Sequence, residues 1–76
     1  REDRDMHYTL TSTEFCHTPG IVRWAQNGAR FKRDRPKMVK VFTEGYGLPK
    51  AAAEKLLDGD CTINDNDGTV SVTVEN

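Results

Sequence analysis

The sequence predicts a small α+β domain, in which a short first strand and a C-terminal β-hairpin form an antiparallel sheet covered by three or four short helices. At 76 residues the chain is long enough for one domain and too short for two. Apolar residues alternate near both ends of the chain and recur at helical spacing between them. All connectors are short, so the sequence contains no evident linker.

The first strand is predicted from Met6 to Leu10. Met6, Tyr8 and Leu10 alternate with polar residues, which is the pattern of a half-buried strand. Residues 1–5 are charged throughout. We expect them to be a disordered arm or a non-native remnant, and we expect residues 6–76 to form the single domain.

Two helix starts follow the strand. Thr11 and Glu14 have the spacing of a capping box, which predicts a turn of helix over 12–17. Thr18 can then cap a longer helix with Pro19 at its first position, because the N–H that proline lacks would have no partner there. Asn27-Gly28 ends this helix. The residues expected to share its core face are Ile21, Trp24 and Ala25.

The middle of the chain continues with a basic connector over 29–35 and a helix that starts near Asp34 and Pro36. An apolar stripe on this helix is expected to face the core: Met38, Val41, Phe42 and Tyr46. Gly45 and Gly47 end it.

Pro49 opens a further helix, and Gly59 fits the position just past its end. Its apolar residues recur at helical spacing: Ala52, Ala53, Leu56 and Leu57. Residues 61–65 and 69–74 then form a hairpin around an Asn-Asp-Gly turn, because Val70, Val72 and Val74 alternate with hydroxyl residues. The first strand can pair with this hairpin and complete a three-stranded sheet. The order of strand, helices and hairpin also fits the outline of a winged helix-turn-helix.

Charge is strongly separated along the chain. Residues 21–40 carry seven cations and one anion, which gives +6, whereas residues 1–20 carry −2 and residues 41–76 carry −5, in agreement with the total of −1. A near-neutral total therefore hides a cationic central segment that can attract anionic partners.

This segment is the candidate binding site, because Lys and Arg can neutralise phosphates and release their counterions. The predicted contacts with nucleic acid or a partner are Arg23, Arg30, Lys32, Arg33, Arg35, Lys37 and Lys40. Trp24 and Phe31 are interleaved with them, although helical position favours Trp24 as a core residue. The sequence therefore predicts a non-enzymatic binding module for DNA or RNA. The alternative is a protein-interaction or inhibitory module that presents the same basic surface to an acidic partner protein.

Other chemistries find weaker support. Cys16, His17 and Glu14 are the nearest set resembling a catalytic group, but neighbouring positions on one short helix point in different directions, so we expect no enzyme. Adjacent Cys16 and His17 are poorly spaced for zinc. A disulfide between Cys16 and Cys61 stays open. We expect no metal and no cofactor.

Two loop motifs are also explained without a ligand. Asp65-Asn66-Asp67-Gly68 does not fit an EF-hand, since Ile63 and Val74 would fall at ligand positions. Gly45-Tyr46-Gly47 lacks the Lys-Ser or Lys-Thr pair of a P-loop. With no membrane-length apolar run and no visible secretory leader, we expect a cytoplasmic protein with no membrane partner. The oligomeric state is left open.

Overall fold

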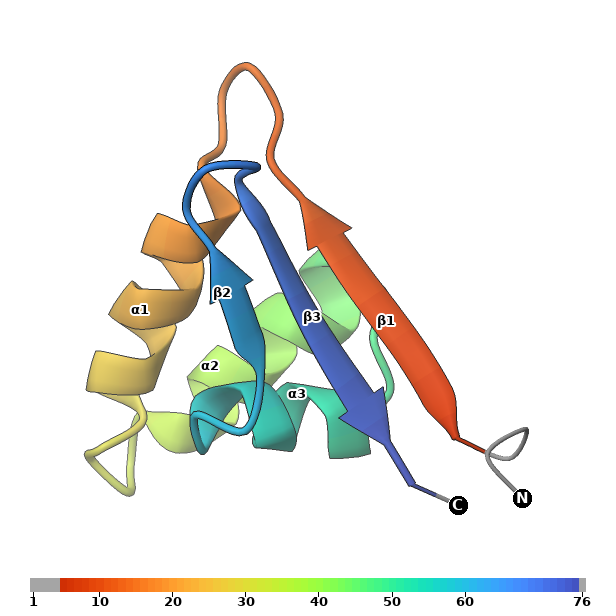
Figure 1. Ribbon diagram of the computed structural model, residues 1–76. Coiled ribbons are helices and arrows are strands. Elements are labelled where there is room, and N and C mark those ends of the chain that lie inside the picture. The colour runs from red at the N-terminus through yellow and green to blue at the C-terminus, as the bar shows by residue number, and fades with distance from the viewer. Residues whose placement is uncertain (1–4, 76) are drawn as a thin grey trace.

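The computed structural model describes residues 5–75, so the arm predicted over residues 1–5 lies outside the described residues except for Asp5. Its elements follow in chain order: β1 (Met6–Thr11), α1 (Thr18–Gly28), α2 (Arg35–Lys40), the π-helical turn η2 (Val41–Gly45), α3 (Lys50–Leu57), β2 (Thr62–Asn64) and β3 (Thr69–Val74). Figure 1 shows the helices lying against one side of a three-stranded sheet. The predicted α+β class, with an N-terminal strand and a C-terminal hairpin, is confirmed.

The sheet is antiparallel, in the order β1-β3-β2. β1 pairs with β3 over its whole length, from Met6 opposite Val74 to Thr11 opposite Thr69. β2 is shorter than predicted and pairs only with Thr69–Ser71. The inward side chains alternate with polar side chains on the outer face, as the period of a strand requires. The inward set is Tyr8, Leu10, Ile63, Val70, Val72 and Val74.

The centre of the core is Phe42, which is fully buried. It lies in η2, where the helix that begins with α2 widens into a π-helical turn. The rings of Phe42 and Tyr46 are 5.6 Å apart, and the Leu48 N–H closes the turn on the Phe42 carbonyl at 3.0 Å. Phe42 is fully buried as predicted, while the other three residues of the stripe are only partly buried. α3 matches its prediction closely, with all four of its expected apolar residues buried.

The core face of α1 differs from the prediction. Trp24 is 57% exposed, and Ile21 is only partly buried. The face that packs inward is formed by residues three or four apart: Thr18, Val22, Ala25 and Ala29. Trp24 lies two residues from Val22, which places it about 200° around the helix and therefore on the opposite side. The prediction that Trp24 lies in the core was wrong.

The predicted helical turn over 12–17 was also wrong. Thr13 and Cys16 exchange backbone hydrogen bonds of 2.9 and 3.3 Å, which form a tight turn instead. Thr18 is the first residue of α1 rather than its cap, and its N–H bonds the Ser12 hydroxyl at 2.9 Å. A serine six residues upstream therefore supplies the capping oxygen, a pairing that local spacing rules do not contain.

Candidate nucleic-acid interface

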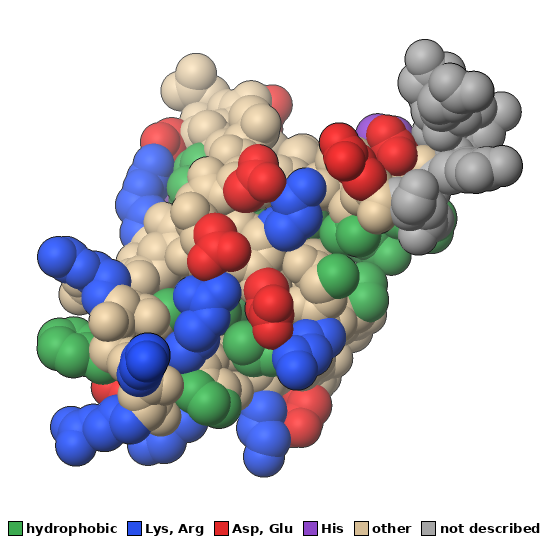
Figure 2. All heavy atoms as spheres, turned by 90° about the horizontal axis from the view of Figure 1, so that it is seen from below, with side chains coloured by type: hydrophobic (Ala, Val, Ile, Leu, Met, Phe, Trp, Pro, Cys, Tyr) green, Lys and Arg blue, Asp and Glu red, His purple; other side chains and the backbone are tan. Residues whose placement is uncertain are grey.

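The seven predicted contact residues come from α1, α2 and the loop between them. Six of them are exposed, and Arg35 is partly buried. In Figure 2, which looks onto this end of the molecule, Lys and Arg side chains crowd one side of the face. Asp and Glu side chains lie farther across it and between some of the cations. The cations therefore gather on one side of this face, and carboxylates of the same chain lie among them.

Two of the seven cations are engaged by carboxylates from the acidic C-terminal half. Arg23 makes a bidentate pair with Asp65, with distances of 2.7 and 2.8 Å. The hydrogen bonds from Arg23, more than its charge, lower the pKa of Asp65. Arg35 donates to Asp58 at 2.9 Å. Arg23 therefore uses two of its five N–H donors on a carboxylate of its own chain.

Four of the remaining five cations have no ion-pair partner within residues 5–75: Arg30, Lys32, Lys37 and Lys40. The fifth, Arg33, has only a long contact of 3.8 Å with its neighbour Asp34, and its side chain is 90% exposed. Exposed pairs at such distances contribute almost nothing. Five cations are therefore accessible to an anionic partner.

Three of these cations lie on one short segment, residues 29–34, which we call the basic loop. Turn hydrogen bonds hold both of its ends: the Phe31 N–H bonds the Gly28 carbonyl at 3.1 Å, and the Phe31 carbonyl accepts from Asp34 and Arg35. Ala29 is buried and anchors the loop to the core. Phe31 is thus held on both sides by backbone bonds, yet its side chain is 62% exposed.

The start of the basic loop depends on a close approach of α1 and α2. A Cβ at Gly28 would lie 2.7 Å from the terminal methyl of Met38. Glycine therefore allows the end of the Met38 side chain to pack against the end of α1.

Beside the basic loop lies a shallow hollow of about 300 Å³. Cations surround an apolar floor, and one carboxylate completes the rim. The lining residues are Lys32, Arg35, Pro36, Val39, Lys50 and Glu54. The Lys50 ammonium is 4.0 Å from Glu54. The hollow can accept a small anionic group with a flat apolar side.

Two further aromatic side chains are exposed, and sequence reasoning missed both. Trp24 lies on α1, as described above. Phe15 is 91% exposed at the tip of the turn between Thr13 and Cys16. The capping-box prediction placed Phe15 on a helical turn, so the sequence carried no signal for its exposure.

The segment that carries Phe15, residues 12–17, is held firmly, and we call it the pinned loop. Ser12 bonds the Gly68 carbonyl through both its hydroxyl, at 2.6 Å, and its N–H, at 3.1 Å. The Thr18 hydroxyl bonds the Thr11 carbonyl at 3.0 Å. The sulfur of Cys16 is 3.5 Å from the Tyr46 hydroxyl. These bonds tie the loop to the β2–β3 turn and to the helices.

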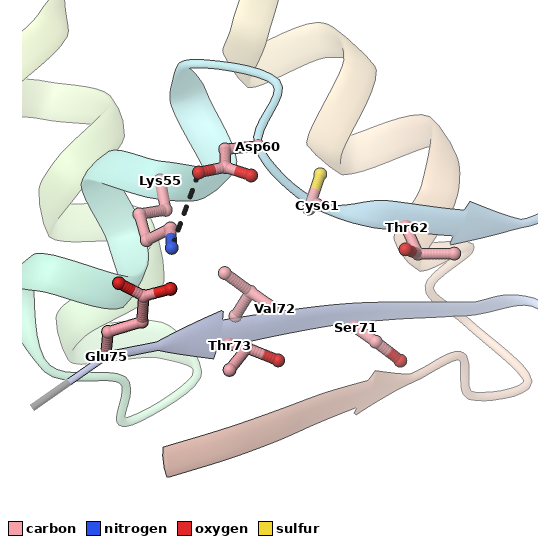
Figure 3. Close-up of a pocket in the computed structure, with 8 residues that line it drawn as sticks. All are labelled: Lys55, Asp60, Cys61, Thr62, Ser71, Val72, Thr73 and Glu75. Atoms are coloured by element: carbon pink, nitrogen blue, oxygen red, sulfur yellow. Dashed lines mark ion pairs between the residues drawn. The ribbon is translucent and has the colours of Figure 1, made fainter. Parts of the chain in front are cut away.

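A second hollow, of about 320 Å³, lies where β3 continues beyond the end of β2. Figure 3 shows Lys55 and Asp60 paired across one wall, and the two charged atoms are 3.4 Å apart. The Cys61 sulfur turns toward α1, where Gln26 Nε2 is 3.8 Å away. Burial, followed by the nearby Asp60 charge, raises the pKa of the Cys61 thiol. A thiol in this state is a poor nucleophile.

Cys16 and Cys61 are both free thiols. In the described part of the chain, no group of three or more His, Cys, Asp or Glu side chains is placed to hold a metal ion. The helices between residues 5 and 75 are all too short or too polar to cross a bilayer.

Comparison of the chain with protein-family models, with curated proteins and with solved structures finds no match.

Proposed function

We propose that this protein binds single-stranded nucleic acid through the basic loop and the adjoining surface of α2. The proposal depends on one observation: Phe31, held by backbone bonds and 62% exposed, lies between exposed cations on both sides in sequence. An aromatic side chain on which a base can stack, with cations that follow the phosphates, is the combination found where single strands are bound without strong sequence preference.

The electrostatic part of the proposal rests on five cations. Arg30, Lys32 and Arg33 come from the basic loop, and Lys37 and Lys40 come from α2. Each phosphate that one of them neutralises releases counterion, so binding is expected to weaken steeply as salt increases. These contacts position the strand and carry no sequence information. Arg23 and Arg35 are left out of the proposed site because Asp65 and Asp58 engage them.

The ion pairing and burial of α3 favour a single strand over a duplex as the ligand. In a winged helix-turn-helix, a helix enters the major groove with free side chains for the bases. Here Lys55 of α3 is 3.4 Å from Asp60, whereas Lys50 has only a long contact of 4.0 Å with Glu54. Four of its eight residues are buried in the core. The winged-helix interpretation stays a prediction, and the loop is the better candidate for the contact.

The test compares two exposed phenylalanines by fluorescence anisotropy with labelled single-stranded and duplex oligonucleotides at several salt concentrations. Phe31→Ala is expected to weaken single-strand binding about tenfold or more, since stacking contributes about 1–3 kcal/mol per base. Phe15→Ala is the matched control, because it removes an exposed ring from the loop at the other end of α1 and is expected to leave the affinity unchanged.

Three results would contradict the proposal: no binding at low salt, equal losses for the two variants, or a duplex preference that Phe31→Ala does not alter. The alternative function, recognition of an acidic protein by the same surface, predicts instead that the wild-type protein ignores oligonucleotides. In a pull-down from nuclease-treated lysate, the wild-type protein would then retain a defined partner protein through Arg30 and Arg33.

A further inference from the structure

The strand β1 is an edge strand with an unprotected outer side. All six of its residues pair with β3, and no segment between residues 5 and 75 pairs with its other side. Figure 1 shows it at the side of the sheet away from α1. Its sequence, Met-His-Tyr-Thr-Leu-Thr, contains no Lys, Arg, Asp, Glu or Pro. Such a strand lacks the usual features that prevent edge-to-edge pairing.

The opposite edge of the sheet is protected. β2 is only three residues long. Asp60 lies just before it, and Asp65 and Asp67 lie in the turn that follows. Short length and flanking charge are the common ways in which an edge strand is made unattractive to other strands. The two edges of one sheet therefore differ, and only β1 offers a full row of backbone groups to a partner.

We propose that β1 pairs antiparallel with β1 of a second copy of this chain, so that two three-stranded sheets join into one of six strands. A second copy is the occupant because the strand complements itself. A two-fold axis perpendicular to the sheet keeps the helices of both subunits on the same face, so inward residues meet inward residues. This inference does not depend on the proposed nucleic-acid binding.

The inward side chains select the register. With Tyr8 on the two-fold axis, Met6 lies opposite Leu10 of the partner subunit. Met6 is 47% exposed in the monomer, although it continues the apolar row of β1. A register shifted by two residues toward the C-terminus would place Met6 opposite the partner's Ser12. The opposite shift would pair only residues 5–9 of the described chain. The first register covers the exposed apolar side chain and is therefore the one expected.

The outward side chains are also compatible with pairing. Within one subunit, His7 Nδ1 lies 3.0 Å from the hydroxyl of Thr73 across the β1–β3 pair. In the proposed register, His7 faces Thr9 of the partner subunit on its other side, so a second cross-strand pair of the same type is available. Asp5 lies opposite the partner's Thr11. No two like charges meet along the paired strands, and like charges directly opposite would oppose pairing.

The first test is the mass of the protein in solution, measured by sedimentation velocity over a wide range of concentrations. The expected mass rises from 8.6 kDa toward twice that value as concentration increases. A mass that stays at 8.6 kDa at every concentration overturns the proposal.

The second test uses matched substitutions at the two edges. Tyr8→Lys sets two ammonium groups against each other on the axis and is expected to weaken association at least tenfold. Ile63→Lys is the control: Ile63 is also partly buried and inward-facing, but lies on β2. Loss of association in Ile63→Lys and its persistence in Tyr8→Lys would overturn the proposal. Circular dichroism checks that both variants fold.

Tyr8 contacts the core, so a milder pair of variants covers the case in which Tyr8→Lys fails to fold. Thr9 and Thr62 are both exposed on the outer face. Thr9→Lys is expected to weaken association several-fold, and Thr62→Lys is expected to leave it unchanged. NMR gives a local readout: on dilution, amide signals of Met6–Thr11 are expected to shift and those of Thr62–Asn64 to stay constant. Shifts confined to other residues would overturn the proposal.

Discussion

The basic loop and the pinned loop both present a phenylalanine to solvent, at 62% exposure for Phe31 and 91% for Phe15, but their surroundings differ in charge and in anchoring. Exposed cations flank Phe31, whereas Glu14 and Cys16 flank Phe15. Backbone turns and the buried Ala29 hold the basic loop, whereas side-chain hydrogen bonds of Ser12, Cys16 and Thr18 hold the pinned loop. Exposure of an aromatic side chain therefore does not identify a nucleic-acid contact. In the proposed function, the charges around the aromatic side chain make that distinction.

The largest expected effect concerns the anchoring of the pinned loop. Ser12→Ala removes the hydroxyl that accepts from the Thr18 N–H at 2.9 Å and donates to the Gly68 carbonyl at 2.6 Å. Leaving a buried donor without a partner costs about 1–3 kcal/mol. We expect chemical denaturation to show a loss of this size. Ser71→Ala, at an exposed position, serves as the control and is expected to change stability by less than about 0.5 kcal/mol.

If Ser12→Ala and Ser71→Ala are equally stable, the side-chain anchor is unimportant. The difference in anchoring between the pinned loop and the basic loop would then have no measurable effect on stability.

The charge of the basic loop gives the next effect. Replacing both Arg30 and Lys32 with Gln is expected to weaken single-strand binding on the order of tenfold at low salt. The slope of log affinity against log salt should become shallower by about 1.4, because each neutralised phosphate of a single strand adds about 0.7 to it. Anisotropy at four or more salt concentrations measures both quantities.

The matched control for this variant replaces Arg23 and Lys55 with Gln, which changes the net charge equally. Both of these cations already have carboxylate partners. An equal loss in the two double variants would mean that net charge, and not the basic loop, determines binding.

A smaller effect concerns the pH dependence of stability. The Arg23 hydrogen bonds lower the pKa of Asp65 from its ordinary value of 3.8. Because the folded value lies below the unfolded one, the contribution of Asp65 is complete above about pH 4 and is lost as pH falls through the folded value. Asp65→Asn is therefore expected to flatten the decline of thermal stability in acid. Arg23→Gln should flatten it similarly. The effect is small because both side chains are largely exposed to water.

The parts of the fold that the sequence predicted well are those with regular apolar spacing. β3 alternates Val with Thr or Ser, and α3 repeats Ala and Leu at helical spacing, so both elements appeared at their expected positions. Trp24 misled the assignment of the α1 face, because a large aromatic residue outweighed the regular series from Thr18 to Ala29. The turn around Phe15 was misjudged because its anchors, Gly68 and Tyr46, are remote in sequence.

The candidate site was predicted less well than the fold. The sequence located the basic segment, and the structure exposes six of its seven cations while pairing Arg23 and Arg35 with carboxylates. The sequence could not indicate that Asp65 and Asp58 pair with Arg23 and Arg35, because the paired residues are 42 and 23 positions apart. Ion pairs of this kind depend on tertiary geometry, which charge counting along the chain does not contain.

The central position of β3 has a consequence for biosynthesis. β1 is translated well before β3, but β3 is its only strand partner within the described chain and extends to Val74. β1 therefore cannot pair within this sheet until β3 has left the ribosome, and its apolar side stays without a strand partner until then. Nascent chains that stop before residue 69 should remain open to proteases, however much helix they contain.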